Sequence, residues 1–418
     1  MAGAAAATIE RTPMNFELSE EQRAFADSVS RFARTHLAEG ALERAHSPRY
    51  PWETAAKLAE QGLLGILFPE ADGGAGGTLM DAVIAIQEVA LVCPRSADIV
   101  QAGNFGPIRT FVEYATPEQK ARFLPDLLAG RSLISLGMTE PDAGSAVTEL
   151  KTSATRDGDG WLINGTKIFS THSPEARLFL VYVRFGPGVG GIGSVLVEKG
   201  TPGFTVGKPS RFMNGEEWSE LHFERCRIPD ANVLLGEGGF KRQIAGFNVE
   251  RLGNSSRSLS VGRHAYNIAR AHAKSRRQFG RTLAEFQGLQ WKFADMAVKL
   301  DAAQLLLYRA VMSAEGGLPS AYDTAVAKLA CNTAGFEVAN EAMQIMGGMG
   351  FSQECLVEYC VRRTRGARKA QRAPQGLQEG CASPSRRAAQ ASGCASPSRR
   401  AAQASGRASR DGAARRSR

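Results

Sequence analysis

Small residues, hydroxyls and three acids are concentrated at residues 137–152, in the text GMTEPDAGSAVTELKT. Glycine allows a backbone to approach a large ligand closely, and Ser and Thr hydroxyls can hydrogen-bond to carbonyl, phosphate or ring-nitrogen groups. Residues 161–168, WLINGTKI, then place strand-forming residues on both sides of Asn164-Gly165, which favours a β-hairpin that turns at this pair. Ligand chemistry is therefore expected on a β element, whereas both flanks of the chain have a helical pattern.

The segment Thr139-Glu140-Pro141-Asp142-Ala143-Gly144-Ser145, together with the strand text that follows it, resembles the acyl-CoA dehydrogenases. These flavoenzymes desaturate acyl-CoA thioesters between Cα and Cβ. The resemblance implies FAD contacts in this part of the chain, and it implies that Ser145 also touches substrate. The sequence departs from the family pattern at Ala146, where Asp is usual, and at Phe169, where Trp is frequent. The implied FAD-binding residues here are Met138, Thr139, Gly144, Ser145, Phe169 and Thr171.

Desaturation of a thioester needs a base for the α-proton and an acceptor for the β-hydride. A carboxylate becomes a suitable base when an apolar pocket raises its pKa. No side chain accepts hydride, so a flavin must do so. Members similar to isovaleryl-CoA and long-chain dehydrogenases carry the acid before Arg-Leu, as in Asn248-Val249-Glu250-Arg251-Leu252. The resemblance thus implies Glu250 as the base and Arg251 near the substrate; the alternative is an ordinary surface pair on a helix.

Two further motifs resemble flavin-binding parts of the family. Gln344 to Phe351 reads QIMGGMGF, and its glycines Gly347 and Gly348 would let a helix end pack against the ADP part of FAD. A helix cap followed by a turn would explain the same glycines. The second motif implies contacts from Arg276, Phe279 and Gln287 to the flavin of a neighbouring subunit. Arginine suits a pyrophosphate because its guanidinium is a planar fork, although a solvated basic helix end is the alternative for this stretch.

The elements that must position these residues fall into three blocks. Residues 14–130 have helical spacing, with a capping-box start at Ser19-x-x-Gln22. Residues 131–239 contain period-two runs bounded by Gly and Pro, and residues 240–365 are helical again. The pattern predicts a multi-domain α+β protein. The resemblance specifies an N-terminal helical domain, a middle β-barrel or sandwich domain, and a C-terminal helical bundle that is truncated.

Length and composition narrow the possibilities. At roughly 150 residues per domain, the 418 residues allow two or three domains. No apolar run is long enough to span a bilayer, and the N-terminus lacks the regions of a secretory signal. The seven cysteines include no zinc-ligand spacing, so we expect no metal site and reduced thiols in a cytoplasmic protein. Gly186-x-Gly188-x-x-Gly191 fits a dinucleotide fingerprint but opens no helix, so it predicts a hairpin loop.

Both ends of the chain are expected to be disordered, at residues 1–13 and 366–418. The C-terminal segment holds twelve Lys/Arg and two Asp/Glu, which accounts for the net charge of +9 and leaves residues 1–365 nearly neutral. It also contains CASPSRRAAQASG twice in tandem. A segment without large apolar residues cannot bury a core. Because the family resemblance stops after Arg365, we hypothesise that a frameshift replaced the native C-terminus; a genuine basic tail that binds an acidic partner is the alternative.

The sequence therefore predicts an FAD-dependent acyl-CoA dehydrogenase that passes electrons to electron-transfer flavoprotein. The resemblance also implies a homo- or hetero-tetramer, if the C-terminus permits assembly. One alternative is a catalytically silent subunit, because the last helix of the bundle is missing. A second is an oxidase or monooxygenase of the same fold. The hypothesis of a nucleic-acid-binding protein rests on the basic tail alone. Neither nucleic acid nor membrane is an expected partner.

Overall fold

The computed structural model describes residues 16–314 and 317–369. The disorder expected at residues 1–13 and in the tail beyond Lys369 concerns residues outside these ranges. Three of the first helices begin at capping boxes, in which a Ser or Thr side chain and the side chain three residues later each bond the other's backbone N–H. The helices before the sheet are α1 Glu20–His36, α2 Ala41–His46, α3 Trp52–Glu60, α4 Leu79–Ala90, α5 Pro94–Asn104, α6 Pro107–Tyr114 and α7 Pro117–Leu128.

The middle of the chain forms a mixed sheet in the order β6-β8-β3-β2-β4-β5-β9, with β1 parallel to β4 and β7 beside β8. Its strands are β1 Ile134–Gly137, β2 Ser153–Asp157, β3 Gly160–Thr171, β4 Leu178–Arg184, β5 Ile192–Glu198, β6 Phe204–Val206, β7 Ser210–Arg211, β8 Glu217–Pro229 and β9 Val233–Leu235. The β4 side chains are buried on both faces. Leu178, Leu180 and Tyr182 pack with α6 and α7, and the alternate residues pack with β3 and β8.

The predicted turn at Asn164-Gly165 is wrong. Both residues lie inside the single strand β3, and its hairpin partner is β2, which joins it through the Gly158-Asp159 turn. The register between β3 and β8 shifts between Ile163 and Gly165, and Asn164 Oδ1 accepts a hydrogen bond from the Arg225 backbone N–H at 2.8 Å. Asn-Gly also suits a β-bulge, because glycine adopts conformations that other residues avoid. The predicted loop at Gly186–Gly191 is confirmed, since it joins the antiparallel strands β4 and β5.

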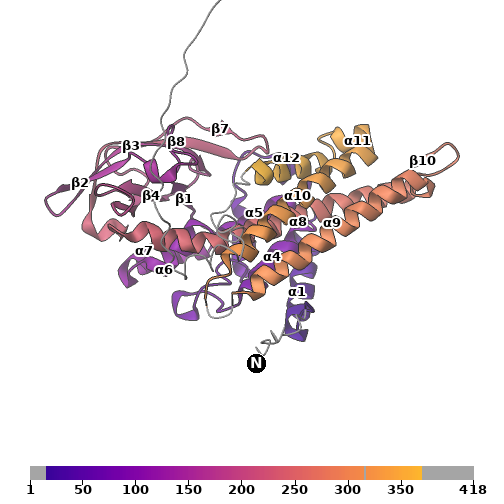
Figure 1. The fold of residues 1–418 in the computed structure, drawn as a ribbon, viewed down its shortest axis with the longest axis horizontal. Helices are drawn as coiled ribbons and strands as arrows, with labels where there is room; N and C mark the ends of the chain where they lie inside the picture. Colours follow the sequence, from indigo (N-terminus) through magenta and orange to yellow (C-terminus); the bar gives the residue numbers. More distant parts are fainter. Residues whose placement is uncertain (1–15, 315–316, 370–418) are drawn as a thin grey trace, which may run out of the picture.

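Long helices follow the sheet and extend away from it (Figure 1). Helices α8 and α10 come close enough that a Cβ on Gly262 would lie 2.7 Å from the Gly335 Cα. Helix α12 continues to Lys369, past the expected boundary at Arg365. These elements are α8 Gly239–Ser275, β10 Arg277–Gln278, β11 Arg281–Thr282, α9 Gln287–Met312, α10 Ala321–Met346, α11 Gly348–Phe351 and α12 Leu356–Lys369.

Helix α8 is the element that joins the helical parts. Its residue Val249 lies in one apolar core with α1, α4 and α5, while Leu252 and Leu259 lie in a second core with α9, α10 and α12. A Cβ on Gly253 would lie 2.8 Å from the Phe105 ring at the end of α5, so the two helices touch there. The predicted order of helices, sheet and helices is confirmed. No helix among the described residues has both the length and the apolar composition needed to cross a membrane.

Candidate active site

Glu250 lies on α8 where this helix faces α5, and it is not part of a surface ion pair. Its Oε1 accepts hydrogen bonds from the Asn254 Nδ2 at 2.8 Å and the Gln101 Nε2 at 3.2 Å. Its Oε2 is buried and has no hydrogen-bond partner among the described residues. One oxygen of this carboxylate is therefore held by two amides, while the other is available to accept a proton.

The surroundings of Glu250 bring its pKa into the neutral range. Burial, which penalises the charged form, raises the pKa to about 7. The Arg257 charge, the hydrogen bonds from Asn254 and Gln101, and the Lys328 charge oppose this shift. A carboxylate with this pKa is substantially ionised at neutral pH and retains enough basicity to accept a proton. Helical Glu residues on a solvated surface do not have this property.

Space beside the free oxygen is kept by a glycine. Gly106, at the start of α6, has φ +72° in the left-handed region, and a Cβ there would lie 3.3 Å from Glu250 Oε2. Arg251 is half-buried, and its Nη1 donates to Asn248 Oδ1 at 2.5 Å. Adjacent helical residues point in different directions. The structure therefore places Arg251 next to Glu250 along the helix without a hydrogen bond or ion pair between them in the described chain, and its contact with substrate stays a prediction.

The loop of Met138, Thr139, Gly144 and Ser145 runs between β1 and β2, and one of its acids, Glu140, is turned inward. Glu140 accepts hydrogen bonds from the backbone N–H groups of Lys151 at 2.6 Å and Thr152 at 2.9 Å, and from Lys167 Nζ at 2.7 Å. Burial opposes the charged form, but these donors and the Lys167 charge hold its pKa below the ordinary value. This acid therefore fastens the loop and is not available as a base.

The same loop is fixed to β3, which places its residues beside Phe169 and Thr171. Thr139 O accepts the Ile168 backbone N–H at 2.8 Å, and Lys167 Nζ donates to Met138 O at 3.3 Å. Ser135 Oγ donates to Thr171 O at 2.8 Å. These contacts bring Met138 and Thr139 beside the end of β3 that carries Phe169 and Thr171, while the roles of all six residues in binding a cofactor stay a prediction.

An aromatic surface lies at this point of the sheet. Phe169 has φ +56°, unusual for a residue with a bulky side chain, and it is 50% exposed. Its ring lies 4.6 Å from the Trp218 ring, and the Phe212 ring lies 5.8 Å from Trp218. Sequence reasoning missed Trp218 and Phe212, although Trp218 could have been found from its position on the strand that pairs with β3. A half-exposed aromatic surface of this kind fits a planar ring system such as a flavin.

The remaining predicted residues lie at the other end of the long helices. Arg276 caps α8, Phe279 is 93% exposed in the β10–β11 turn, and Gln287 begins α9. Gln344 lies in the last turn of α10, with Gly347 at φ +59° as the cap of this helix and Gly348 beginning α11. An ion pair between Lys292 and Glu341 places the start of α9 beside the end of α10.

Figure 1 shows β10 far from the sheet. Within one chain, the structure therefore does not bring Arg276, Phe279 or Gln287 to the loop after β1. Their contact with the FAD of a neighbouring subunit remains a prediction.

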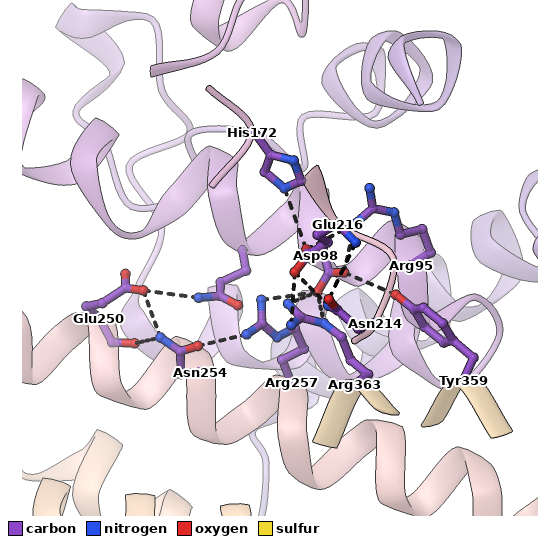
Figure 2. Close-up of polar contacts among 11 residues, drawn as sticks. Arg95, Asp98, His172, Asn214, Glu216, Glu250, Asn254, Arg257, Tyr359 and Arg363 are labelled. Atoms are coloured by element: carbon purple, nitrogen blue, oxygen red, sulfur yellow. Dashed lines mark hydrogen bonds and ion pairs between the residues drawn. The ribbon is translucent and has the colours of Figure 1, made fainter. Parts of the chain in front are cut away.

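A buried cluster of charges that sequence reasoning missed lies to one side of Glu250, beyond Asn254 (Figure 2). Asp98 accepts Arg363 Nη2 at 2.7 Å and Arg257 Nη1 at 3.1 Å. Glu216 pairs with Arg95 at 3.0 Å and with Arg363 at 3.3 Å. Burial favours a neutral Glu216, but Arg363, His172 and Arg95 hold its pKa well below the ordinary value. The members of this cluster come from α5, the β7–β8 connection, α8 and α12. Because these elements are far apart along the chain, no local sequence pattern predicts the cluster.

The chain has helical, sheet and helical parts in this order, an exposed aromatic surface on the sheet, and an acid on α8 with a raised pKa. Comparison with known proteins identifies the family that shares this arrangement. Family models described as the N-terminal, middle and C-terminal domains of acyl-CoA dehydrogenase match residues 19–131, 135–226 and 237–371. A short-chain-specific acyl-CoA dehydrogenase of Clostridium acetobutylicum is 34% identical over 84% of this chain and 93% of that protein. A 3-sulfinopropanoyl-CoA desulfinase of Paraburkholderia xenovorans is 35% identical over 84% and 92%.

Solved structures agree. The butyryl-CoA dehydrogenase of Megasphaera elsdenii has a TM-score of 0.80 and 31% identity, covering 88% of this chain and 98% of that one. A chain from a study of the electron transferring flavoprotein of Acidaminococcus fermentans has a TM-score of 0.81 and 33% identity, with the same coverage. The chain belongs to the acyl-CoA dehydrogenase family. It is an FAD-dependent oxidoreductase, as the members of this family are.

Proposed function

We propose that this enzyme desaturates an acyl-CoA thioester at Cα–Cβ and that Glu250 takes the α-proton on its Oε2. The observation that carries the proposal is the geometry of this carboxylate: one oxygen is held by two amides, and the other is buried without a partner in the described part of the chain. A pKa raised to about 7 fits a base that must be ionised before the reaction and protonated after it. FAD supplies the hydride acceptor for the β-carbon.

The residues proposed to hold FAD are Met138, Thr139, Gly144, Ser145, Phe169 and Thr171 of one subunit. The exposed Phe169 ring, packed on Trp218, supports this assignment because it offers a planar surface beside the loop. Ser145 and Arg251 are proposed to contact substrate. Arg276, Phe279, Gln287, Gln344, Gly347 and Gly348 are proposed to complete the FAD site of a second subunit, within a tetramer. Phe279 is too exposed to have a structural role within one chain, which supports this division.

Electron-transfer flavoprotein is the proposed electron acceptor. Support comes from the structural neighbour that was described in a study of such a flavoprotein. The desulfinase among the relatives shows that the family includes a protein named for another reaction on a CoA thioester. No feature of the described site favours desulfination over desaturation.

The test is the visible spectrum of the purified full chain, before and after anaerobic addition of a panel of acyl-CoAs. A flavin spectrum that bleaches, with an enoyl-CoA as product, is the expected result. A colourless protein would support a catalytically silent subunit. Rapid reaction of the reduced flavin with oxygen would support the oxidase or monooxygenase alternative. Release of sulfite from 3-sulfinopropanoyl-CoA, without bleaching, would contradict desaturation.

A further inference from the structure

Asn254 connects the proposed base to the buried charge cluster. It lies one helical turn after Glu250, and its Nδ2 donates to Glu250 Oε1 at 2.8 Å. Its Oδ1 accepts a hydrogen bond from Arg257 Nη2 at 2.8 Å. Arg257 Nη1 in turn pairs with Asp98 Oδ1 at 3.1 Å. Figure 2 shows the four side chains in one continuous series.

The orientation of the Asn254 amide follows from the chemistry of its neighbours. A guanidinium can only donate hydrogen bonds, and an ionised carboxylate can only accept them. The amide oxygen must therefore face Arg257, and the amide nitrogen must face Glu250. The flipped amide would place its oxygen against the carboxylate and its NH₂ against the guanidinium, losing both bonds. Arg257 thus determines which group Asn254 presents to the base.

Arg257 is itself fixed by the cluster and is not left to pair with Glu250. Asp98 binds Arg257 and also accepts Arg363 Nε at 3.0 Å and Nη2 at 2.7 Å. The Tyr359 hydroxyl lies 3.5 Å from the second oxygen of Asp98. A guanidinium bound directly to Glu250 would hold the carboxylate ionised and make it a poor base. Asn254 instead transmits the position of Arg257 as a neutral hydrogen-bond donor.

We propose that Asn254 is the positioning residue of the base: oriented by Arg257, it holds Glu250 Oε1 so that Oε2 remains free for the substrate. This inference rests on the proposed role of Glu250 as the base. Asn254 also donates to the Glu250 backbone oxygen at 3.3 Å, so its side chain is held close to the same helical turn. Gln101, at 3.2 Å from the same Oε1, is a second and longer contact from α5.

The groups that face Glu250 predict how its titration responds. Asn254 and Arg257 lie on α8, Gln101 on α5 and Lys328 on α10, and all of them favour the ionised form, while burial opposes it. Gly106 of α6 adds no charge. Replacing Asn254 by an apolar side chain removes a donor to the carboxylate, which disfavours ionisation. The pH at which the base becomes active should therefore rise.

The experiment measures the pH dependence of kcat/KM for flavin reduction in the full-length holoenzyme, with an acyl-CoA that bleaches the wild-type flavin. Asn254→Leu should move the acidic limb of the pH profile upward by about one pH unit, so that activity at pH 7 falls roughly fivefold and recovers at higher pH. Asn254→Asp keeps a hydrogen-bond acceptor for Arg257 but places a second carboxylate next to that of Glu250. It should move the limb further upward, and it tests the inference if the Leu variant does not fold.

Asn332→Leu is the matched control. Asn332 is buried on α10 and donates to Ala367 O at 3.2 Å, with no contact to Glu250 given by the structure. This variant should lose thermal stability without moving the limb, which separates positioning from a general loss of packing. Both Asn254 variants retaining the wild-type limb would overturn the inference.

Glu250→Gln distinguishes failure of the inference from failure of the proposed function. If the Gln variant is inactive while the Asn254 variants behave like wild type, only the positioning role is wrong. If the Gln variant still reduces flavin at the wild-type rate, the base lies elsewhere and the inference falls with it.

Discussion

Two carboxylates, the buried Glu140 in the loop after β1 and the partly buried Glu250 on α8, have opposite electrostatic environments. Glu140 accepts from two backbone N–H groups and from a buried lysine, and its pKa is lowered. Among the described residues, Glu250 has two amide donors on one oxygen and none on the other, and its pKa is raised to about 7. Burial alone therefore does not predict the role of an acid. The number and charge of its donors separate an anchor from a candidate base.

The largest expected effect comes from Glu250→Gln, which keeps the volume but removes the proton acceptor. Because a positioned base contributes roughly 10²–10⁴-fold to the rate, we expect flavin reduction by acyl-CoA to slow by about 10³-fold. FAD content should be unchanged, since the predicted cofactor residues lie in the loop after β1, on β3, at the far end of α8 and around the ends of α9 and α10. Exchange of the α-proton with solvent in a bound acyl-CoA should also stop, as measured by NMR. Undiminished exchange of the α-proton in Glu250→Gln would show that Glu250 is not the base, and the two acids would then not differ in catalytic role.

Glu140→Gln should have its main effect on stability. The change leaves the Lys167 ammonium buried without a charged partner, and breaking a buried pair costs about 3 kcal/mol. We expect a lower free energy of unfolding in denaturant titration and weaker retention of FAD, because the loop is no longer fastened. Asp142→Asn is the control in the same loop. Its pair with Lys151 is about three-quarters exposed, so its loss should cost less than ~1 kcal/mol.

The smallest effect, and the sharpest test of the comparison, is the pH dependence of stability. The raised pKa of Glu250 means that the folded protein keeps a proton that the unfolded chain releases above pH 4.5. Its contribution to stability therefore decreases as the pH rises from 4.5 to about 7. Relative to wild type, Glu250→Gln should gain stability between pH 5 and pH 8, by ~2 kcal/mol.

Glu140 should show the reverse slope. Its lowered pKa means that its stabilising contribution is complete above pH 4.5 and is lost as the pH falls below this value. The deficit of Glu140→Gln should therefore shrink in acid. Denaturant titrations of both variants and wild type between pH 3 and pH 8 measure the two slopes. Slopes of the same sign would show that the two environments are not as different as their contacts indicate.

Local signals in the sequence predicted the local parts of the fold. The capping box at Ser19 and Gln22 begins α1 where expected, and Gly347 ends α10. Such features depend on residues within one helical turn, so a sequence contains all their partners. Asn164-Gly165 shows what a local sequence pattern cannot predict, because the same two residues suit a hairpin turn or a bulge in a continuous strand. The pairing of β3 with β2 and β8 decides between them.

The sequence by itself determined the order of helical, sheet and helical parts, the family, and the choice of Glu250 as the candidate base. Only the tertiary structure decided that Glu140 is an anchor, because Lys167 approaches it across the sheet. It also decided the surroundings of Glu250, which depend on Gln101 from another helix and on the cluster that orients Asn254. Hydrogen bonds and charges act over a few ångströms, and residues at that distance in space are often far apart along the chain.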